Sequence, residues 1–547
     1  MKLLIRNLKV HYNNWAGLSL FFIGIILLPT LFIGVKFFAK PNDNWYHIQE
    51  FLLTQYIQNT LILIFFTGLF TVLIGVSLAW IVTAYDFPLR KFFKWGLILP
   101  LAIPPYIGAY TYNGMLNYTG IIQSTLRNSF GLKLDQKYFD IMTMQGTIFI
   151  FTAFLFPYVY IITKAFLENQ SSALIENARL LGSSSFGVFF RIVLPLSRTA
   201  IIGGVSLVIL EVLNDYGVVK FFGIQTFSTA IFQAWFGMGD LDSAIKLAGV
   251  LMTIVVIILV FEKILRGRRN YNYSTTKVRP IQPSTLPKWK SWILFGYTTG
   301  IFLLAFLIPL LQLIYWLFMT YERIFSPEFL KLVWNSLSVA LISSSIIILI
   351  ALIIANYSRL SHGMLAKFIT KIIVLGYSIP GAIIAIGVLT VFIALDKEIF
   401  GLYEMMGLQP TVVLSMSIVM LLFAYIIRFL AIGYNSIEAG FDKVGTSFTE
   451  ASRMLGNNIT QSFFKVDIKM IKGAVFGGFI LVFIDILKEL PLTLLLQPFN
   501  FYTLATKAFQ YASDEMIQEA ALASLLIILL SSASIVVFHY IFEKESK

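Results

Sequence analysis

Long apolar runs alternate with short polar segments rich in Lys and Arg along the whole chain. A helix that spans about 30 Å of hydrocarbon needs about 20 mostly apolar residues, so each such run predicts a membrane-spanning helix. The runs lie near residues 15–38, 57–84, 95–116, 145–164, 199–221 and 245–265, and then near 292–318, 334–357, 369–395, 411–434, 473–497 and 518–542. The pattern therefore predicts an all-α, polytopic membrane protein of about twelve helices.

The composition agrees with this prediction and excludes a soluble globular enzyme. Hydrophobic residues make up 58% of the chain and charged residues 13%, whereas soluble domains contain about 45–50% and about 25%. A mean hydropathy of +0.81 requires lipid as the main solvent. The chain has no Cys and only four His, which excludes disulfides, iron-sulfur clusters and thiolate zinc sites, and we expect no cofactor bound by the chain itself.

The basic residues indicate the orientation of the chain in the membrane. Twelve crossings with the N-terminus inside would place about 29 of the 41 Lys and Arg residues on the cytoplasmic side, so we expect both termini there. The +13 net charge is therefore interpreted as a topology signal and not as a nucleic-acid site. The first apolar run follows Lys2, Arg6 and Lys9 and is interpreted as a retained signal anchor.

A repeat relates the two halves of the sequence. Asn59-Thr60-Leu61 matches Asn335-Ser336-Leu337 at an offset of 276 residues, and the segment 176–240 matches 450–514 at an offset of 274 without a gap. Six helices per half is an even number, so both copies enter the membrane in the same direction, about a pseudo-two-fold axis along the membrane normal. We expect a first six-helix half at 1–266, a cytoplasmic linker at 267–290 and a second half at 291–547.

The loop between the fourth and fifth predicted helices carries a spaced motif. Glu176-Asn177-Ala178 is followed after three residues by Gly182, and after nine more by Ile192, Leu194 and Pro195. This resembles the EAA loop of ABC importer permeases, whose pattern is E-A-A, three residues, Gly, nine residues, I-x-L-P. The second half keeps Glu450-Ala451-Ser452 and Gly456, but Val466-Asp467-Ile468-Lys469 replaces the ending. An ordinary helical loop with a Gly cap is the alternative, which two copies at one offset disfavour.

The resemblance extends over essentially the whole chain to the fused, two-half permeases of ferric iron ABC importers. It rests on residues 211–217, 227–240, 488–491 and 511–515. It implies a type I importer fold in a bacterial inner (plasma) membrane, an extracytoplasmic binding protein, and a pair of ATPase subunits that hold ATP and Mg. The chain itself has no G-x-x-x-x-G-K-[ST] loop, so it is expected to be a translocation subunit and not an enzyme. The residues expected to couple the ATPases are Glu176, Ala178, Gly182, Leu194, Pro195, Glu450, Ala451 and Gly456.

Acidic residues in the fifth helix of each half are candidates for the translocation pathway. Glu211 and Asp485 are equivalent by the repeat, Asp215 and Glu489 follow one turn later, and Tyr216 is a further oxygen donor. Acids in lipid are costly, so they are expected to face a wet interior, where up to four carboxylates would attract a hard metal cation. Glu211 and Asp485 are the candidate metal contacts. The alternative is that these acids pair with Lys220 and Lys488 for structural reasons, or that they sit in the headgroup zone at the outer ends of the helices.

Other functions stay open at this point. Within the importer class the alternatives are thiamine or another organic cation, since aromatic side chains around the acids would favour such a solute. An ion-driven secondary transporter would also use repeats, but it has no reason to keep two EAA loops. Pro104-Pro105 and Pro380-Gly381 predict a break in the third helix of each half, which serves either gating or a simple kink.

Overall fold

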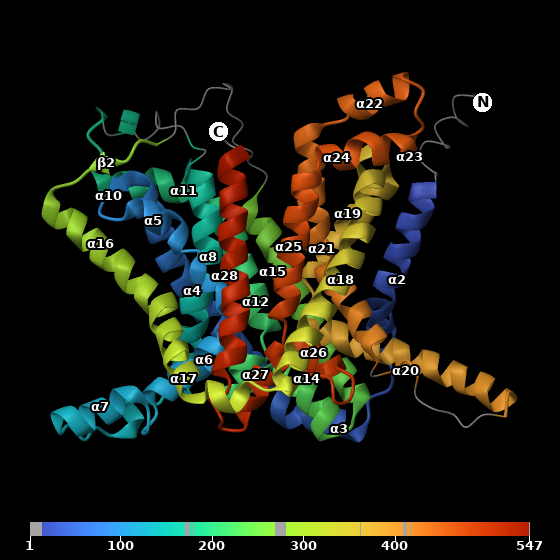
Figure 1. Cartoon of the computed structure of the whole chain (residues 1–547), viewed down its shortest axis with the longest axis horizontal. Coiled ribbons are helices and arrows are strands. Elements are labelled where there is room, and N and C mark those ends of the chain that lie inside the picture. Colours follow the sequence, from blue (N-terminus) through green and yellow to red (C-terminus); the bar gives the residue numbers. More distant parts are fainter. Residues whose placement is uncertain are drawn as a thin grey trace. The chain divides into compact units, whose positions relative to one another are not determined.

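The computed structural model describes residues 14–168, 170, 176–178, 180–267, 281–361, 363–407, 413–415 and 417–545. Within these residues the chain is almost entirely helical (Figure 1). The elements up to residue 266 are α2 (Asn14–Phe37), α3 (Asp43–His47), η1 (Ile48–Leu52), α4 (Leu53–Ala84), β1 (Tyr85–Asp86), α5 (Arg90–Gly96), η2 (Leu99–Ala102), α6 (Pro105–Leu116), α7 (Ile121–Phe130), η3 (Gln136–Tyr138), α8 (Met144–Glu168), α10 (Ser185–Val188), η4 (Phe189–Val193), α11 (Leu194–Leu196), α12 (Arg198–Asn214), α13 (Gly217–Phe221), α14 (Phe227–Phe232), η5 (Gln233–Gly237) and α15 (Leu241–Arg266).

The second part of the chain is also almost entirely helical. Its elements are β2 (Ser284–Thr285), α16 (Lys288–Phe302), η6 (Leu303–Leu307), α17 (Ile308–Ile324), α18 (Pro327–Leu360), α19 (Met364–Tyr377), α20 (Gly381–Met405), α21 (Ile418–Val444), α22 (Ser447–Met454), α23 (Ile459–Ser462), η7 (Phe463–Asp467), α24 (Ile468–Met470), α25 (Lys472–Leu487), α26 (Pro491–Leu496), α27 (Leu504–Ser513) and α28 (Ala521–Glu545). Every one of the twelve predicted runs lies on one or more of these helices.

Seven helices among the described residues are long and apolar enough to cross a membrane, and the number rises to ten if each of three bent pairs is one span. The bends are 88° after η2, 69° between α11 and α12, and 74° between α24 and α25. Ala521–Val537 is a further, shorter apolar helix. The all-α, polytopic prediction is therefore confirmed.

Two predicted runs end earlier than the apolar pattern suggested. The run 199–221 divides into α12 and α13, and the run 473–497 divides into α25 and α26. Asp215 stands at the first division and Glu489 at the second. The apolar pattern continues through each division, because the short helix after it is also buried, so the pattern alone could not locate these ends.

The compact units of the structure exchange segments between the two sequence halves. One unit comprises 1–47, 231–252 and 325–507, and the other comprises 48–230, 253–324 and 508–547. In the first unit α2 packs on α18, α19 and α20, and in the second unit α17 packs on α6 and α28. The division of the chain into two six-helix halves and a linker stays a prediction. The two units show which helices pack together in one core. Basic residues 268, 269, 277 and 279 of the predicted linker lie outside the described residues.

A cluster of polar side chains holds the C-terminal end of α2 within the first unit. The Asp240 carboxylate accepts hydrogen bonds from the Asn42 and Asn44 amides at 2.8 and 3.0 Å and from the Ser243 hydroxyl at 2.6 Å. Burial by itself would raise the pKa of Asp240, but these hydrogen bonds together hold it below its ordinary value. The buried Lys246 ammonium donates to the carbonyls at the end of α2, from Phe37 and Ala39. Side chains 200 residues from α2 therefore fix its position.

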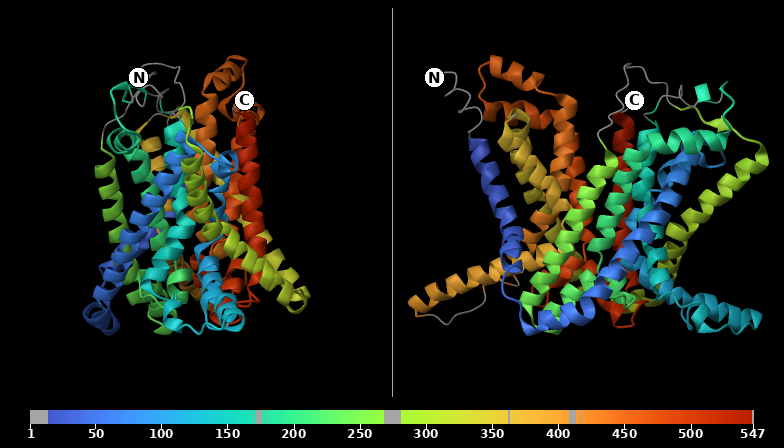
Figure 2. Two further views of the ribbon diagram at one scale, coloured as in Figure 1. Left: turned by 90° about the vertical axis from the view of Figure 1, so that its left-hand side faces the viewer. Right: turned by 180° about the vertical axis from the view of Figure 1, so that it is seen from behind.

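The linker and the C-terminal end of α4 meet in the second unit. Ser284–Thr285 pairs in parallel with Tyr85–Asp86, which forms the two-stranded sheet of the described residues. The Ser284 hydroxyl also donates to the carbonyl of Ala84 at 3.1 Å. This contact places the start of α16 beside the C-terminal end of α4, and α5 packs on both helices. Figure 2 shows the chain segment around β2 from two further sides.

Candidate functional site

The second EAA-like loop is a helix, a left-handed glycine and a bent helix. Glu450 lies in α22, whose side toward the protein buries Thr449 and Ser452 and whose other side is exposed. Gly456 ends this helix with φ of 91°, a conformation that L side chains rarely adopt. The Asn457 amide donates to the carbonyl of Ser452, and Asn458 then caps α23. The chain turns sharply at this glycine.

The first loop has the same backbone geometry at the equivalent residues. Glu176 is exposed and Ala178 is buried, within a short helical segment. Gly182 has φ of 83°, and the Ser183 amide donates to the carbonyl of Ala178 just as Asn457 donates to Ser452. Leu194 and Pro195 follow in α11, at the bend into α12. Both loops thus present an exposed acidic helix that ends at a positive-φ glycine.

The sequence interpretation missed a pair of exposed apolar residues just before each glycine. Leu180 and Leu181 are 85% and 87% exposed, and their equivalents Met454 and Leu455 are 90% and 85% exposed. A large apolar side chain this exposed at the tip of a loop is a common feature of a docking surface. The signal in the sequence was the apolar pair inside an otherwise polar loop, which helical periodicity alone would assign to a core.

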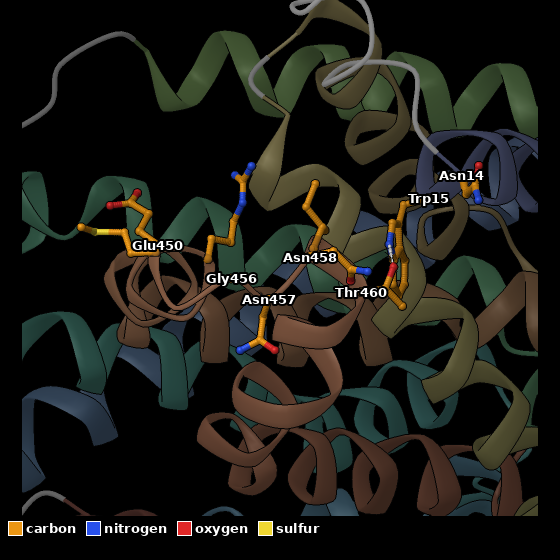
Figure 3. A pocket seen from close by; sticks show the side chains of 10 residues that line it. Asn14, Trp15, Glu450, Gly456, Asn457, Asn458 and Thr460 are labelled. Atoms are coloured by element: carbon orange, nitrogen blue, oxygen red, sulfur yellow. Dashed lines mark hydrogen bonds between the residues drawn. The ribbon is translucent and has the colours of Figure 1, made fainter.

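A groove of about 810 Å³ borders the second loop. Its walls come from the end of α22, the turn at Gly456, the start of α23 and the first residues of α2 (Figure 3). The Trp15 indole donates to the Thr460 hydroxyl at 3.3 Å, and its ring meets Phe463 edge-on at 4.8 Å. The start of α2 is therefore packed against the second loop. In the other unit Phe189, the equivalent of Phe463, packs against Trp80 of α4 at 5.9 Å.

Two of the four predicted pathway acids cap short helices. The Asp215 carboxylate accepts from the Val218 amide at 2.8 Å, at the start of α13. The Glu489 carboxylate accepts from the Leu492 and Thr493 amides at 3.3 Å each, at the start of α26. Amide groups at a helix start lack partners within the helix, and a carboxylate is well suited to them. The repeat has thus preserved a capping acid at equivalent positions.

The other pair lies one turn earlier on α12 and α25. Asp485 forms an ion pair with Lys488 at 2.7 Å, with both side chains about one-quarter exposed. Glu211 is half-buried. Tyr216 is buried, with its ring 6.0 Å from that of Phe509. No group of three or more His, Asp or Glu side chains among the described residues is arranged to hold a metal ion.

Arg428 was missed as a residue with a specific role. It is a buried cation in the middle of α21, and its guanidinium donates to the carbonyl of Ile379 at 2.6 Å. That carbonyl stands immediately before the break at Pro380, and Arg428 also lies near enough to Glu489 for their charges to interact. A single Arg inside an apolar run was the available signal. If the offset of 274 residues is extended to this helix, the matching residue is Phe154, whose ring packs against Gly108 just after the break at Pro104.

The chain matches the family described as binding-protein-dependent transport system inner membrane component twice, over residues 72–262 and 347–547. The chain belongs to this family. The two matched regions contain the two glycine-ended loops, which confirms that the repeat is a duplicated permease module. The resemblance to ABC importer permeases is thereby confirmed, and the chain is a permease of an ABC importer in the inner membrane.

Among curated relatives, an Fe(3+)-transport system permease protein (FbpB 2) of Haemophilus influenzae is 25% identical over 94% of this permease and 96% of the relative. The sulfate transport system permease protein CysT of Escherichia coli is 28% identical over 38% of this permease and 72% of the relative. The molybdenum transport system permease protein ModB of Escherichia coli is 28% identical over 27% of this permease and 62% of the relative. Permeases of this family are translocation components that work with an ATPase and a substrate-binding protein.

Proposed function

We propose that this permease imports ferric iron, delivered by an extracytoplasmic binding protein and driven by two ATPase subunits that hold ATP and Mg. The observation that carries the proposal is the extent of similarity. The Fe(3+) permease aligns over nearly the whole of both chains, whereas the sulfate and molybdenum permeases align over 38% and 27% of this one. A fused two-half architecture is thus shared with the iron permease.

The test is uptake into proteoliposomes that contain the permease, its ATPase and its binding protein. We expect ferric iron to stimulate ATP hydrolysis and to accumulate inside, and thiamine, polyamines, sulfate and molybdate to do neither. Stimulation by thiamine or a polyamine without stimulation by iron would replace the substrate and keep the importer mechanism. Uptake without any ATPase would contradict the mechanism itself.

We further propose that the two glycine-ended loops are the contacts of the ATPase pair and lie in the cytoplasm, together with both termini. Support comes from the exposed faces around Glu176 and Glu450 and from the exposed apolar pairs beside them. When the ATPase subunits close on ATP, they would pull the two loops with them. This movement would switch the permease between inward-facing and outward-facing states. The variant Glu176→Lys with Glu450→Lys is expected to lose copurification of the ATPase while it still inserts in the membrane.

For the translocation pathway we propose Glu211 and Asp485, and not the capping acids, as the carboxylates that meet a cationic solute. Asp215 and Glu489 are engaged by helix amides, whereas Asp485 pairs with the Lys488 side chain and is partly exposed. The variant Glu211→Gln with Asp485→Asn should abolish uptake per folded molecule and preserve ATPase binding. Normal uptake per molecule would remove both carboxylates from the mechanism, and a loss of yield alone would favour the ion-pair alternative.

A further inference from the structure

The second loop carries a buried charged residue that the first loop lacks. Asp467 ends η7 and is 2% exposed, and its equivalent Val193 is buried and apolar. A buried carboxylate is costly unless it is paired and hydrogen-bonded. Its presence in place of an apolar residue therefore calls for a specific partner.

That partner is Arg359, at the inner end of α18 and 108 residues away in sequence. The Arg359 guanidinium donates to one Asp467 carboxylate oxygen at 2.8 Å, and the Thr449 hydroxyl of α22 donates to the other at 2.7 Å. The same carboxylate thus joins three elements: α18, α22 and the bent helix that leads into α25. One group fixes both arms of the second loop to a membrane-spanning helix.

Arg359 has little freedom to find another arrangement. It is 8% exposed, its guanidinium lies over the ring of Phe441 at 4.1 Å, and it also donates to the amide oxygen of Asn356 at 3.0 Å. Its Nε and Nη1 atoms are buried without a hydrogen-bond partner among the described residues. Asp467 is the carboxylate that neutralises it. If the loop moved away from α18, the guanidinium would be left charged and buried without its carboxylate, which is strongly unfavourable.

The first half has no equivalent of this pair. The residue that matches Arg359 is Thr83, whose hydroxyl donates to the carbonyl of Ala79 in its own helix at 2.8 Å. The residue that matches Asn356 is Trp80, which packs on Phe189 of the first loop. Van der Waals contact between rings is less directional than a charged hydrogen bond, so it permits sliding where the ion pair does not.

We infer that Arg359 and Asp467 are positioning residues that make the second loop and the inner end of α18 one rigid body, whereas the first loop is free to slide on α4. The inference rests on the proposed role of these loops in energy coupling. It predicts that movement imposed on the second loop is passed to α18 without loss.

The test uses spin labels, which the absence of Cys makes specific. One pair is placed at the exposed residues Lys465 and Leu349, and the matched control pair at their equivalents Arg191 and Leu73 in the other unit. Distances are measured by pulsed electron resonance in the permease with its ATPase, without nucleotide and with ATP and vanadate. We expect one narrow distance for Lys465 and Leu349 in both states, and a broader, nucleotide-dependent distribution for Arg191 and Leu73.

The decisive variant is Arg359→Thr with Asp467→Val, which gives the second half the residues of the first. We expect this variant to fold, because no charge is left buried, and to broaden the distance between the labels at 465 and 349. An unchanged narrow distance in this variant would overturn the inference. Asp467→Asn, which keeps the hydrogen-bonding geometry without the charge, should broaden the distribution less.

The spin-label experiment can fail independently of the proposed function. The distance without nucleotide tests the rigid attachment whether or not the ATPase grips this loop. Failure of the ATPase to copurify would count against the proposed coupling role, and the nucleotide-free distance would then be measured in the permease alone. A broad distance in the parental permease would count against the rigid attachment alone.

Discussion

The two glycine-ended loops share a backbone conformation and differ in how they are attached to the rest of the chain. Each has an exposed acidic helix, a glycine at φ of 83° or 91°, and an exposed apolar pair before that glycine. The second is held by a buried ion pair between Asp467 and Arg359, and the first by packing of Phe189 on Trp80. The comparison teaches that the two copies are more alike in the exposed face of the loop than in the buried contacts behind it.

The departure of the second loop from the I-x-L-P ending has a physical reason in this comparison. The residues Val466-Asp467-Ile468-Lys469 lose the Pro of the first loop, and they gain the carboxylate that joins α22 to α18. The changed ending of the second loop is therefore a different way to attach the loop to its neighbouring helices. The motif alone would have suggested that the second loop binds its partner less tightly than the first.

The largest expected effect on stability is a difference between the residues that attach the two loops, Asp467 and Val193. Asp467→Ala should lower the free energy of unfolding by about 3–5 kcal/mol, because the Arg359 charge stays buried without its partner. The equivalent Val193→Ala should cost roughly 1–3 kcal/mol, since it removes only apolar contacts. Thermal unfolding of both variants in one detergent measures the difference. Equal costs at the two positions would contradict the distinction between a charged and an apolar attachment.

A second comparison concerns the helix breaks. Arg428→Met should cost about 2–3 kcal/mol, because the Ile379 carbonyl loses its donor and Glu489 loses a neighbouring positive charge but keeps its amide hydrogen bonds. Phe154→Leu, at the equivalent residue, should cost roughly 1 kcal/mol. Unfolding in detergent gives both values. If Phe154→Leu proved the more damaging, the break before Pro380 would not depend on the guanidinium.

The glycines should show the symmetry of the loops. A Cβ at Gly182 or Gly456 would meet no atom within 4 Å, so valine there acts through the backbone alone and should cost about 1–2 kcal/mol at each. Both variants should reduce copurification of the ATPase to a similar extent. Gly131, which has φ of 67° at the end of α7 and equally open surroundings, is the control. Gly131→Val should leave copurification unchanged, and a loss there would show a general folding defect.

The smallest effect on stability is expected at the loop tips. Leu180→Ser with Leu181→Ser, and Met454→Ser with Leu455→Ser, should change the free energy of unfolding by no more than about 0.5 kcal/mol, because these side chains are already exposed. Both double variants should still weaken the ATPase complex, which titration of the ATPase against the permease in nanodiscs measures. If both double variants bound the ATPase as tightly as the parental permease does, the docking surface would lie elsewhere on the loops.

Much of the fold was predictable because it depends on local rules. The length and apolarity of each run determine that it forms a helix across lipid, since every backbone amide must be satisfied within the segment. Proline 104 and proline 380 determine where the third helix of each half breaks, since neither can donate an amide hydrogen bond. Gly182 and Gly456 determine the turns, since they adopt positive φ without a steric cost.

Side-chain partners depended on the tertiary structure. The repeat predicted that Asp215 and Glu489 are equivalent, but an acid at a helix end can cap the next helix or face a pathway, and only the packed structure distinguishes these roles. The position of α2 beside α18, and the meeting of Arg359 with Asp467, join residues far apart in the chain. Sequence determines what each segment is, because hydrophobicity and backbone geometry act locally. The tertiary structure determines which segment meets which, because packing and ion pairing depend on distances in space.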